Sequence, residues 1–185
     1  NLISKNKVTK GDIILGLESS GIHSNGFSLV RKIIHENNIN LKNRLPFNST
    51  SLGQFLLQPT KIYVKSLTKC FKYKNAISGI AHITGGGLIL NPPRILPEEY
   101  CIKFDMNAFK LPPIFNWLKK IGNIGDYEFL RTFNCGIGMM VIVKPEFSEI
   151  IFKELKKTGQ NVWKIGKVFP RRKNKVEFKN IKKFF

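Results

Sequence analysis

Hydrophobic residues recur at two spacings along this chain, and each spacing predicts one kind of element. Short apolar or alternating runs, bounded by Gly, Asp or Pro, predict strands. These runs span residues 10–17, 77–84, 99–106, 136–143, 162–169 and 175–179. The run GIGMMVIV at 136–143 is the most apolar in the chain, which indicates a central strand that is covered on both faces.

Apolar residues three or four positions apart predict helices in the intervening segments. These helices begin near Phe27, fall within residues 51–71 and 114–121, and continue at 126–133 and 145–157. Pro59 divides the segment 51–71 into two helices, because proline interrupts the hydrogen bonds of a helix interior. Ser24 or Asn25 is placed to cap the helix that begins at Phe27. Strands and helices mix without strict βαβ regularity, so we expect an α+β fold with helices layered on a mixed sheet.

The length and composition are typical of a single folded domain. The chain has 185 residues, of which 42% are hydrophobic and 11% aromatic, as in globular proteins with a buried core. No apolar run approaches the roughly 20 residues that a membrane-spanning helix needs, so we expect no membrane partner. The chain begins with Asn1 instead of Met, which indicates a piece of a longer chain.

The charge is strongly positive, with 31 Lys and Arg against 12 Asp and Glu, which gives a net charge of +19. Such a balance normally raises the question of nucleic-acid binding. However, the lysines are spread along the chain, and no helix–turn–helix, zinc finger or aromatic RNA-binding motif accompanies them. The sequence is also rich in residues of AT-rich codons, so mutational bias can explain the lysine content without a nucleic-acid partner. An anionic small substrate fits the positive charge equally well.

Cysteine usage indicates a reducing compartment. The three cysteines, Cys70, Cys101 and Cys135, are odd in number and far apart, and they match neither a zinc spacing nor a disulfide framework. The simplest interpretation is a cytoplasmic protein. Cys135 lies between Asn134 and Gly136 without a neighbouring base, so the pattern favours a small buried thiol over a nucleophile.

A glycine triplet is the first candidate for chemistry. Gly85, Gly86 and Gly87 follow the strand expected at 77–84 and precede a helix start, with Thr84 before them and Arg94 shortly after. Unpaired amides and a helix dipole make such a junction a natural anion site, while a tight connection between packed elements explains the glycines equally well. The triplet matches neither of the two common nucleotide-binding glycine loops.

A second strand–loop–helix junction carries the chain's best-placed histidine. The loop SSGIHSNG at 19–26 is dense in small polar residues, among them Ser20, Gly21, Ser24 and Asn25. His23 in this loop is a candidate for proton transfer or for donation to an anion. A hydrogen bond that only fixes the loop is the alternative interpretation.

Five strings stand out in order along the chain: SSGIHSNGFSLVR at 19–31, PTKIYV at 59–64, AHITGGG at 81–87, RTFNCGIGM at 131–139 and WKIG at 163–166. Together they resemble signature segments of the phosphoribosylformylglycinamidine cyclo-ligase (AIR synthetase) family. The resemblance spans about Lys10 to Gly166 and covers only the C-terminal half of that enzyme. Two positions depart from the family pattern, since Leu90 replaces a common Glu and Glu18 replaces a frequent Pro.

The resemblance implies a fold and a domain organisation. The family's C-terminal domain is a three-layer α/β/α, ferredoxin-like α+β domain with a mixed sheet flanked by helices. We therefore expect a linker at 1–10 from a missing N-terminal domain, the domain itself at 11–170 and a basic tail at 171–185. The family's N-terminal half carries the acidic metal-binding and ATP-binding motifs and builds the centre of a homodimer. Mg²⁺ ligands are accordingly expected in that half, and no metal site in this one.

The resemblance also implies a reaction in purine biosynthesis. ATP activates the formamide oxygen of formylglycinamidine ribonucleotide as a phosphate ester, and the amidine nitrogen then expels phosphate. The products are aminoimidazole ribonucleotide, ADP and phosphate. The alternative is a catalytically incomplete remnant, or an anion-binding domain of the related synthetase and kinase superfamily.

Residue roles follow from the matching strings. His23 is the candidate catalytic residue, for proton transfer or for stabilisation of the leaving oxygen. Arg131, Thr132 and Asn134 are either substrate contacts or residues that only fix the cleft wall. The full set of expected substrate or phosphate contacts is Ser20, Gly21, Ser24, Asn25, Thr84, Gly85, Gly86, Gly87, Arg94, Arg131, Thr132 and Asn134.

Overall fold

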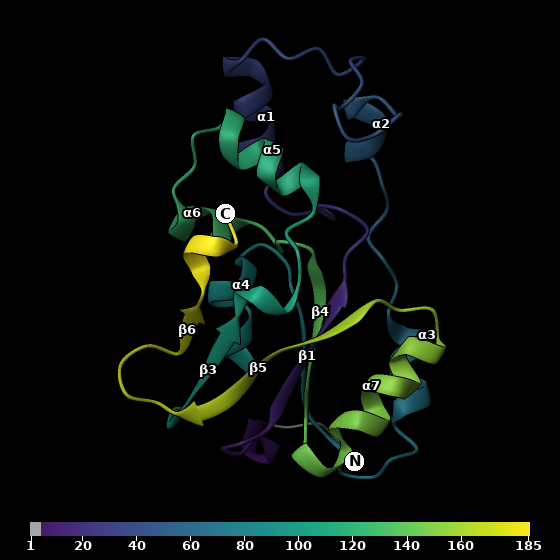
Figure 1. The fold of residues 1–185 in the computed structure, drawn as a ribbon, viewed down its shortest axis with the longest axis vertical. Coiled ribbons are helices and arrows are strands. Elements are labelled where there is room, and N and C mark those ends of the chain that lie inside the picture. Colours follow the sequence, from purple (N-terminus) through teal and green to yellow (C-terminus); the bar gives the residue numbers. More distant parts are fainter. Residues whose placement is uncertain (1–4) are drawn as a thin grey trace.

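Six strands form one mixed sheet in the computed structural model, which describes residues 5–185. The spatial order is β2-β4-β1-β5-β3-β6, and all neighbours are antiparallel except the parallel pair β3 and β6 (Figure 1). The strands are β1 (Ile13–Glu18), β2 (Ile77–His82), β3 (Tyr100–Asp105), β4 (Ile137–Val143), β5 (Val162–Pro170) and β6 (Val176–Lys179).

Helices cover both faces of this sheet. On one face, α3 (Val64–Cys70) and α7 (Ser148–Lys157) pack against each other and against β1, β2 and β4 (Figure 1). The other face carries α1 (Phe27–Glu36), α4 (Gly87–Leu90), α5 (Pro113–Ile121) and α6 (Asp126–Thr132), while the short α2 (Leu52–Leu56) lies near α1. Five 3₁₀ turns complete the elements: η1 (Lys5–Lys7), η2 (Pro92–Ile95), η3 (Met106–Ala108), η4 (Pro145–Phe147) and η5 (Ile181–Lys183).

Strand β4 explains why one run of the sequence is almost wholly apolar. Met140 and Ile142 belong to the core between the sheet and α1, α4, α5 and α6, whereas Val141 and Val143 belong to the core under α3 and α7. All four side chains are fully buried, because successive residues of a strand point to opposite faces. The expected central strand is confirmed, and so is the three-layer α+β fold with its mixed sheet.

Proline and glycine set several element boundaries as expected. Pro59 lies between α2 and α3, Pro113 begins α5, and Gly122 ends it. The expected side-chain cap of α1 is wrong. The N-cap is Gly26, whose left-handed φ of 71° turns the chain before the helix, and no side chain caps the helix. Neither Ser24 nor Asn25 therefore caps α1.

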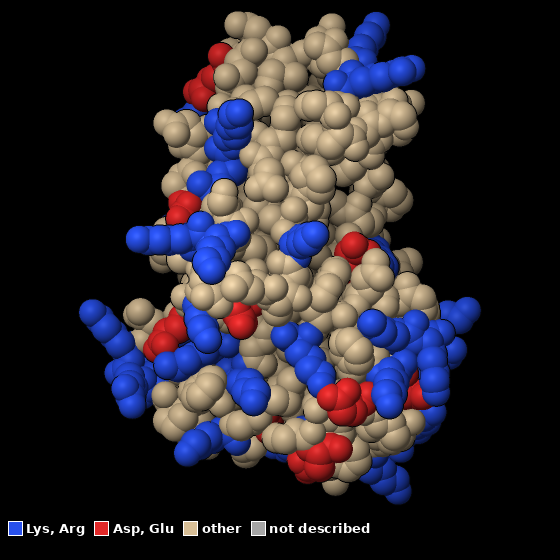
Figure 2. All heavy atoms as spheres, in the orientation of Figure 1, with Lys and Arg blue, Asp and Glu red and all other residues tan. Residues whose placement is uncertain are grey.

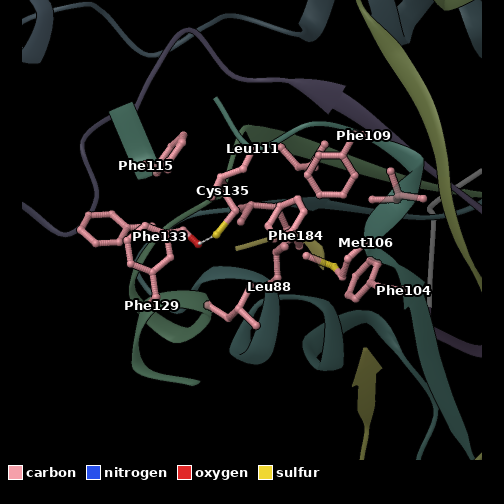
Figure 3. Packing of buried hydrophobic residues seen from close by; sticks show 14 of the residues in the cluster. Leu88, Phe104, Met106, Phe109, Leu111, Phe115, Phe129, Phe133, Cys135 and Phe184 are labelled. Atoms are coloured by element: carbon pink, nitrogen blue, oxygen red, sulfur yellow. Dashed lines mark hydrogen bonds between the residues drawn. The ribbon is translucent and has the colours of Figure 1, made fainter. Parts of the chain in front are cut away.

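Both ends of the described chain take part in the packing. Val8 is 1% exposed, and β6 pairs with β3 as the last strand of the sheet. Phe184 packs edge-on against Phe109, with ring centroids 5.0 Å apart, and lies among the buried aromatic residues of Figure 3. Within residues 5–185, no helix combines the length and the apolar character needed to cross a membrane.

Candidate functional site

His23 lies in the loop between β1 and α1, in a left-handed backbone conformation with a φ of 56°. Its ring is buried, and Nε2 accepts hydrogen bonds from the backbone N–H groups of Ser20, at 3.1 Å, and Lys61, at 3.5 Å. An imidazole nitrogen that accepts carries no proton, so the neutral ring is protonated at Nδ1. Nδ1 is buried and has no partner within the described residues.

The electrostatic surroundings keep this histidine neutral. Burial lowers the pKa of His23 from 6.5 to about 4, with smaller contributions from nearby His82 and Lys61. At neutral pH the ring is therefore a hydrogen-bond donor through Nδ1 and an acceptor through Nε2. It carries no positive charge with which to attract a phosphate.

Tyr63 and His82 surround His23 and form an aromatic cluster with it. The His23 ring centroid lies 6.4 Å from that of Tyr63 and 6.1 Å from that of His82. The Tyr63 hydroxyl donates to the backbone carbonyl of Glu18 at 2.7 Å, and burial, followed by the charge of Glu18, raises the pKa of Tyr63. The cluster thus joins the end of β1, the start of α3 and the end of β2.

Gly138 in β4 makes room for this cluster. A Cβ atom at this position would lie 2.5 Å from His23 Cε1 and would overlap the Tyr63 hydroxyl. Such distances are far inside van der Waals contact, so only glycine fits beneath the two rings. Gly138 is a supporting residue of the site that the spacing of the sequence did not single out.

Asn134 fastens the His23 loop to the beginning of β4. The side chain is fully buried, and its Oδ1 accepts from the Ser19 hydroxyl at 3.1 Å and from the Gly136 N–H at 2.8 Å. Its Nδ2 donates to the Gly21 carbonyl at 3.0 Å. All of these partners belong to the protein, which makes Asn134 a structural clamp in this arrangement. Cys135 beside it is also fully buried, and burial raises the pKa of its thiol.

The three glycines at the end of β2 have different environments. The backbone conformation of Gly87 is left-handed, and a Cβ there would lie 2.7 Å from the Phe133 carbonyl oxygen and would overlap that of Leu130. Gly87 therefore lets α4 pack closely against α6, and its N–H donates to the Thr84 carbonyl at 2.9 Å. Gly87 therefore fits the alternative explanation of the glycines, which is a tight connection between packed elements.

Gly85 and Gly86 retain the amides that an anion needs. Neither N–H forms a hydrogen bond within residues 5–185, and the space around Gly85 is open, with no atom within 4 Å of an added Cβ. The preceding residue is held in place, because the Thr84 N–H donates to Asn91 Oδ1 at 2.7 Å. Of the three glycines, Gly85 and Gly86 are therefore the ones whose amides suit an anion site.

Loop residues around the glycines bring the predicted segments together. Asn25 Nδ2 donates to the Ile83 carbonyl at 3.4 Å, just before the glycine loop. A Cβ on Gly26 would lie 3.0 Å from Thr132 Cγ2, so the His23 loop also touches the end of α6. The His23 loop at 19–26, the glycine loop at 84–87 and the segment 131–136 therefore converge.

The remaining predicted residues lie at the border of this convergence. Ser20 Oγ donates to the Pro59 carbonyl at 2.7 Å, and Ser24 Oγ lies 3.4 Å from the Thr60 hydroxyl. Thr132 Oγ1 donates to Glu128 at 3.1 Å. The side chains of Arg94, on η2, and Arg131, on α6, are exposed, and neither forms an ion pair within the described residues. Within residues 5–185, no hydrogen bond or ion pair joins either arginine side chain to the glycine loop, although the Arg131 backbone lies beside Gly87.

The donor set of the site suits an anion and does not suit a metal ion. Within residues 5–185, no group of three or more His, Cys, Asp or Glu side chains is arranged to hold a metal ion. Free glycine amides, hydroxyl groups and a neutral imidazole are hydrogen-bonding groups, which recognise phosphate or carbonyl oxygen.

The fold is shared with several enzymes and maturation proteins that contain a similar domain. Thiamine-monophosphate kinase from Stenotrophomonas maltophilia K279a has a TM-score of 0.61 at 11% identity, over 95% of this chain and 52% of that chain. E. coli HypE, a hydrogenase maturation protein, has a TM-score of 0.61 at 14% identity, over 96% of this chain and 48% of that chain. T. maritima PurL complexed with AMPPCP has a TM-score of 0.53 at 11% identity, over 97% of this chain and 25% of that chain.

These likenesses define the class of domain, and the sequence defines the family. The family described as AIR synthase related protein, C-terminal domain, matches residues 9–179. The chain belongs to this family. It spans about half the length, or less, of the solved structures that it resembles.

Proposed function

We propose that this chain is the C-terminal domain of an ATP-dependent cyclo-ligase of purine biosynthesis. The reaction closes the imidazole ring of formylglycinamidine ribonucleotide and yields aminoimidazole ribonucleotide, ADP and phosphate. The observation that carries the proposal is the convergence of the three loops at 19–26, 84–87 and 131–136. These loops contain three of the strings that resemble the cyclo-ligase signature, and family membership supports the assignment.

The proposed contribution of this domain is to hold and neutralise phosphate groups. The free N–H groups of Gly85 and Gly86 are suited to a phosphate of ATP or of the ribonucleotide, because preorganised amides stabilise negative charge without reorganising. Ser24 and Asn25 line the same region from the opposite loop. Exposed Arg94 and Arg131 would supply positive charge, while Ser20, Gly21, Thr84, Thr132, Asn134 and Gly87 would support the loops.

His23 is proposed to act mainly as a positioning residue. Its Nε2 holds the Ser20 amide, and its neutral ring offers one unpaired donor at Nδ1. A histidine whose pKa is lowered to about 4 is a poor proton source at neutral pH. Donation from Nδ1 to a carbonyl or phosphate oxygen fits this protonation state better than proton transfer.

The complete reaction requires residues beyond this chain. We propose that the Mg²⁺ ligands belong to an N-terminal domain, as the resemblance to the cyclo-ligase family implies, and the described residues contain no group of three or more His, Cys, Asp or Glu side chains arranged around a metal position. PurL complexed with AMPPCP, whose fold includes a similar domain, supports ATP as a substrate. We further propose a cytoplasmic homodimer, and the three buried, unpaired cysteines are consistent with a reducing compartment.

The deciding experiment uses a full-length protein that contains this chain. Incubation with formylglycinamidine ribonucleotide and ATP is expected to give aminoimidazole ribonucleotide and one phosphate for each ring closed. Phosphorylation of a different acceptor, without ring closure, would assign the domain to another branch of the family. Absence of any ATP-dependent turnover would contradict the proposal.

The role of His23 is tested in the same protein. His23→Asn keeps a residue that tolerates the left-handed backbone but removes the Nε2 acceptor and the Nδ1 donor in their present positions. We expect turnover to fall about a hundredfold, because misplacing a loop by about 1 Å has effects of that size. His35→Asn, on the exposed side of α1, is the matched control and should retain normal turnover. Normal turnover of His23→Asn would remove His23 from the site.

A further inference from the structure

A mostly apolar groove of about 740 Å³ runs beside the last strand of the sheet and is lined by residues of α4, α6 and β6. Leu90 at the end of α4, Tyr127 on α6 and Ile181 on η5 are among its lining residues. The chain itself leaves this surface open, and Leu90 is 42% exposed. The full lining is Ile89, Leu90, Pro93, Asp126, Tyr127, Leu130, Asn174, Lys175, Val176, Glu177, Phe178 and Ile181.

One wall of the groove is the free edge of β6. This strand pairs only with β3, in the register Ile102 opposite Val176 and Phe104 opposite Phe178, and the Ile102 N–H donates to the Lys175 carbonyl at 2.9 Å. In a parallel ladder with this register, the N–H and C=O groups of Val176 and Phe178 point away from β3. These groups form no hydrogen bond within residues 5–185, so they are available to another strand.

Positive charge flanks both ends of this edge. Arg172 and Lys173 precede β6, and Lys179, Lys182 and Lys183 lie at its end and just beyond it. Figure 2 shows Lys and Arg side chains gathered over the lower half of the molecule, where β3, β5 and β6 lie. None of these five side chains forms an ion pair in the part of the chain that the structure describes.

The charges within the groove itself are already neutralised. Lys175 pairs with Glu98 at 3.0 Å, Glu177 with Lys103 at 2.8 Å, and Asp126 with Lys119 at 2.8 Å. The surface therefore has three parts, namely an apolar centre, an unpaired strand edge and cationic ends. This combination is complementary to an extended chain with apolar residues in its middle and carboxylates at its ends.

We propose that the β6 groove binds an extended, acidic-flanked peptide segment of a partner protein, which adds to the sheet as a strand beside β6. The main chain of the segment pairs with the outward groups of Val176 and Phe178, while alternate apolar side chains enter the groove against Leu90 and Ile181. The acidic flanks meet the cationic ends, which favours this partner over a neutral or basic one.

Fluorescence anisotropy with a labelled synthetic peptide tests the proposal. The probe carries alternating Val and Thr between Asp/Glu ends, and a control peptide has the same centre between Lys ends. We expect saturable binding of the acidic probe, weakened by salt, and no binding of the basic control. Failure of the acidic probe to bind the purified chain would overturn the proposal.

A matched pair of variants locates the binding surface. Leu90→Glu places a carboxylate in the groove, whereas Ile150→Glu makes the same change on α7, and the two side chains are 42% and 40% exposed. Leu90→Glu should weaken binding about tenfold, because it replaces an apolar contact and adds a like charge. Ile150→Glu should bind as the wild type does, and equal effects of the two variants would contradict the location.

Two further measurements separate this occupant from others. Arg172→Glu with Lys173→Glu should weaken binding and reduce its salt dependence, because these residues meet the acidic flank. Sedimentation of the chain alone tests a second copy as the occupant. A concentration-dependent dimer that Leu90→Glu abolishes would assign the groove to self-association and overturn the peptide proposal. Oligonucleotide binding that displaces the peptide would likewise overturn it in favour of a nucleic acid.

Discussion

His23 is held by its own loop in a position that determines its chemistry. The left-handed backbone directs the ring inward, where Nε2 receives the Ser20 amide and Nδ1 has no partner. The same burial that organises the loop lowers the pKa of the ring to about 4. A residue that the sequence offers as a proton carrier is therefore a neutral hydrogen-bonding group in the folded protein.

Stability is expected to depend on pH through this residue. The folded-state pKa of about 4 lies below the ordinary value of 6.5, so the unfolded chain binds more protons between these two pH values. The contribution is complete above pH 6.5 and is lost as the pH falls towards 4, by up to about 3 kcal/mol. Urea unfolding should be measured at several pH values between 4 and 6.5. The free energy of unfolding of His23→Asn should change less steeply with pH than that of the wild type. His35→Asn should keep the pH dependence of the wild type. An unchanged pH dependence in His23→Asn would contradict the assignment of this effect to His23.

Gly138 provides a second prediction at the scale of single residues. Gly138→Ala forces a Cβ into the space of the His23 and Tyr63 rings, so we expect a loss of about 2 kcal/mol or more in the free energy of unfolding. Gly85→Ala is the matched control, because nothing lies within 4 Å of its added Cβ. Thermal and urea unfolding of both variants test this prediction. Equal stability of the two variants would contradict it and would show that the His23 and Tyr63 rings can move aside without cost.

Short polar connections determine how the elements of this domain meet. Asn134 joins the loop after β1 to the start of β4, and Asn91 holds the residue that precedes the glycines. Gly87 lets α4 lie directly on α6. The sequence marked Asn134 and Gly87 as candidate contacts, and the structure shows that both hold one element against another.

Among the buried polar residues that connect elements, Asp12 is expected to lose the most stability on substitution. It is fully buried before β1, accepts from the Thr9 N–H at 3.1 Å, and pairs with Lys144 Nζ at 3.2 Å. Asp12→Ala removes the carboxylate that balances the charge of Lys144 and the acceptor of the Thr9 N–H, while Lys144 keeps its hydrogen bonds to the Lys7 carbonyl and the Thr9 hydroxyl. We expect the free energy of unfolding to fall by about 3 kcal/mol. Glu149→Ala, which removes an exposed ion pair with Lys164, should change it little. Urea unfolding distinguishes the two outcomes.

At the scale of the whole molecule, this chain is shorter than the solved structures whose fold it shares. The chain spans about half of thiamine-monophosphate kinase and of HypE, and about a quarter of PurL. The converging loops offer hydrogen-bond donors, and the described residues contain no cluster that could hold a metal ion. The proposed ring closure assigns the metal ligands to a second domain, and this assignment can be tested.

The isolated chain should accordingly lack turnover. We expect residues 1–185, incubated with formylglycinamidine ribonucleotide, ATP and Mg²⁺, to form no aminoimidazole ribonucleotide, because the proposal assigns the groups that hold the metal-bound phosphates to another domain. A longer protein that contains the same chain is the control. Ring closure by the isolated chain would show that the site is complete within it.

Much of the fold could be predicted because it depends on local patterns. Met140, Val141, Ile142 and Val143 are all apolar and point to opposite faces of the sheet in turn, so this strand must be covered on both faces whichever strands it pairs with. Pro59 interrupts a helix in any context. The five strings placed the chain in its family. The α1 cap was predicted wrongly because Ser24 and Asn25 use their side chains for distant partners, Thr60 and Ile83.

The sequence by itself determined the α+β class, the central strand and the candidate loops, since periodicity, proline and glycine act over a few residues. Only the tertiary structure decided what each site residue does. Whether the space beside a loop glycine is open, as at Gly85, or filled by the backbone of another element, as at Gly87, depends on α6, which is distant in the sequence. The same is true of His23, whose neutrality arises from burial beside Tyr63, His82 and Gly138, residues that only folding brings together.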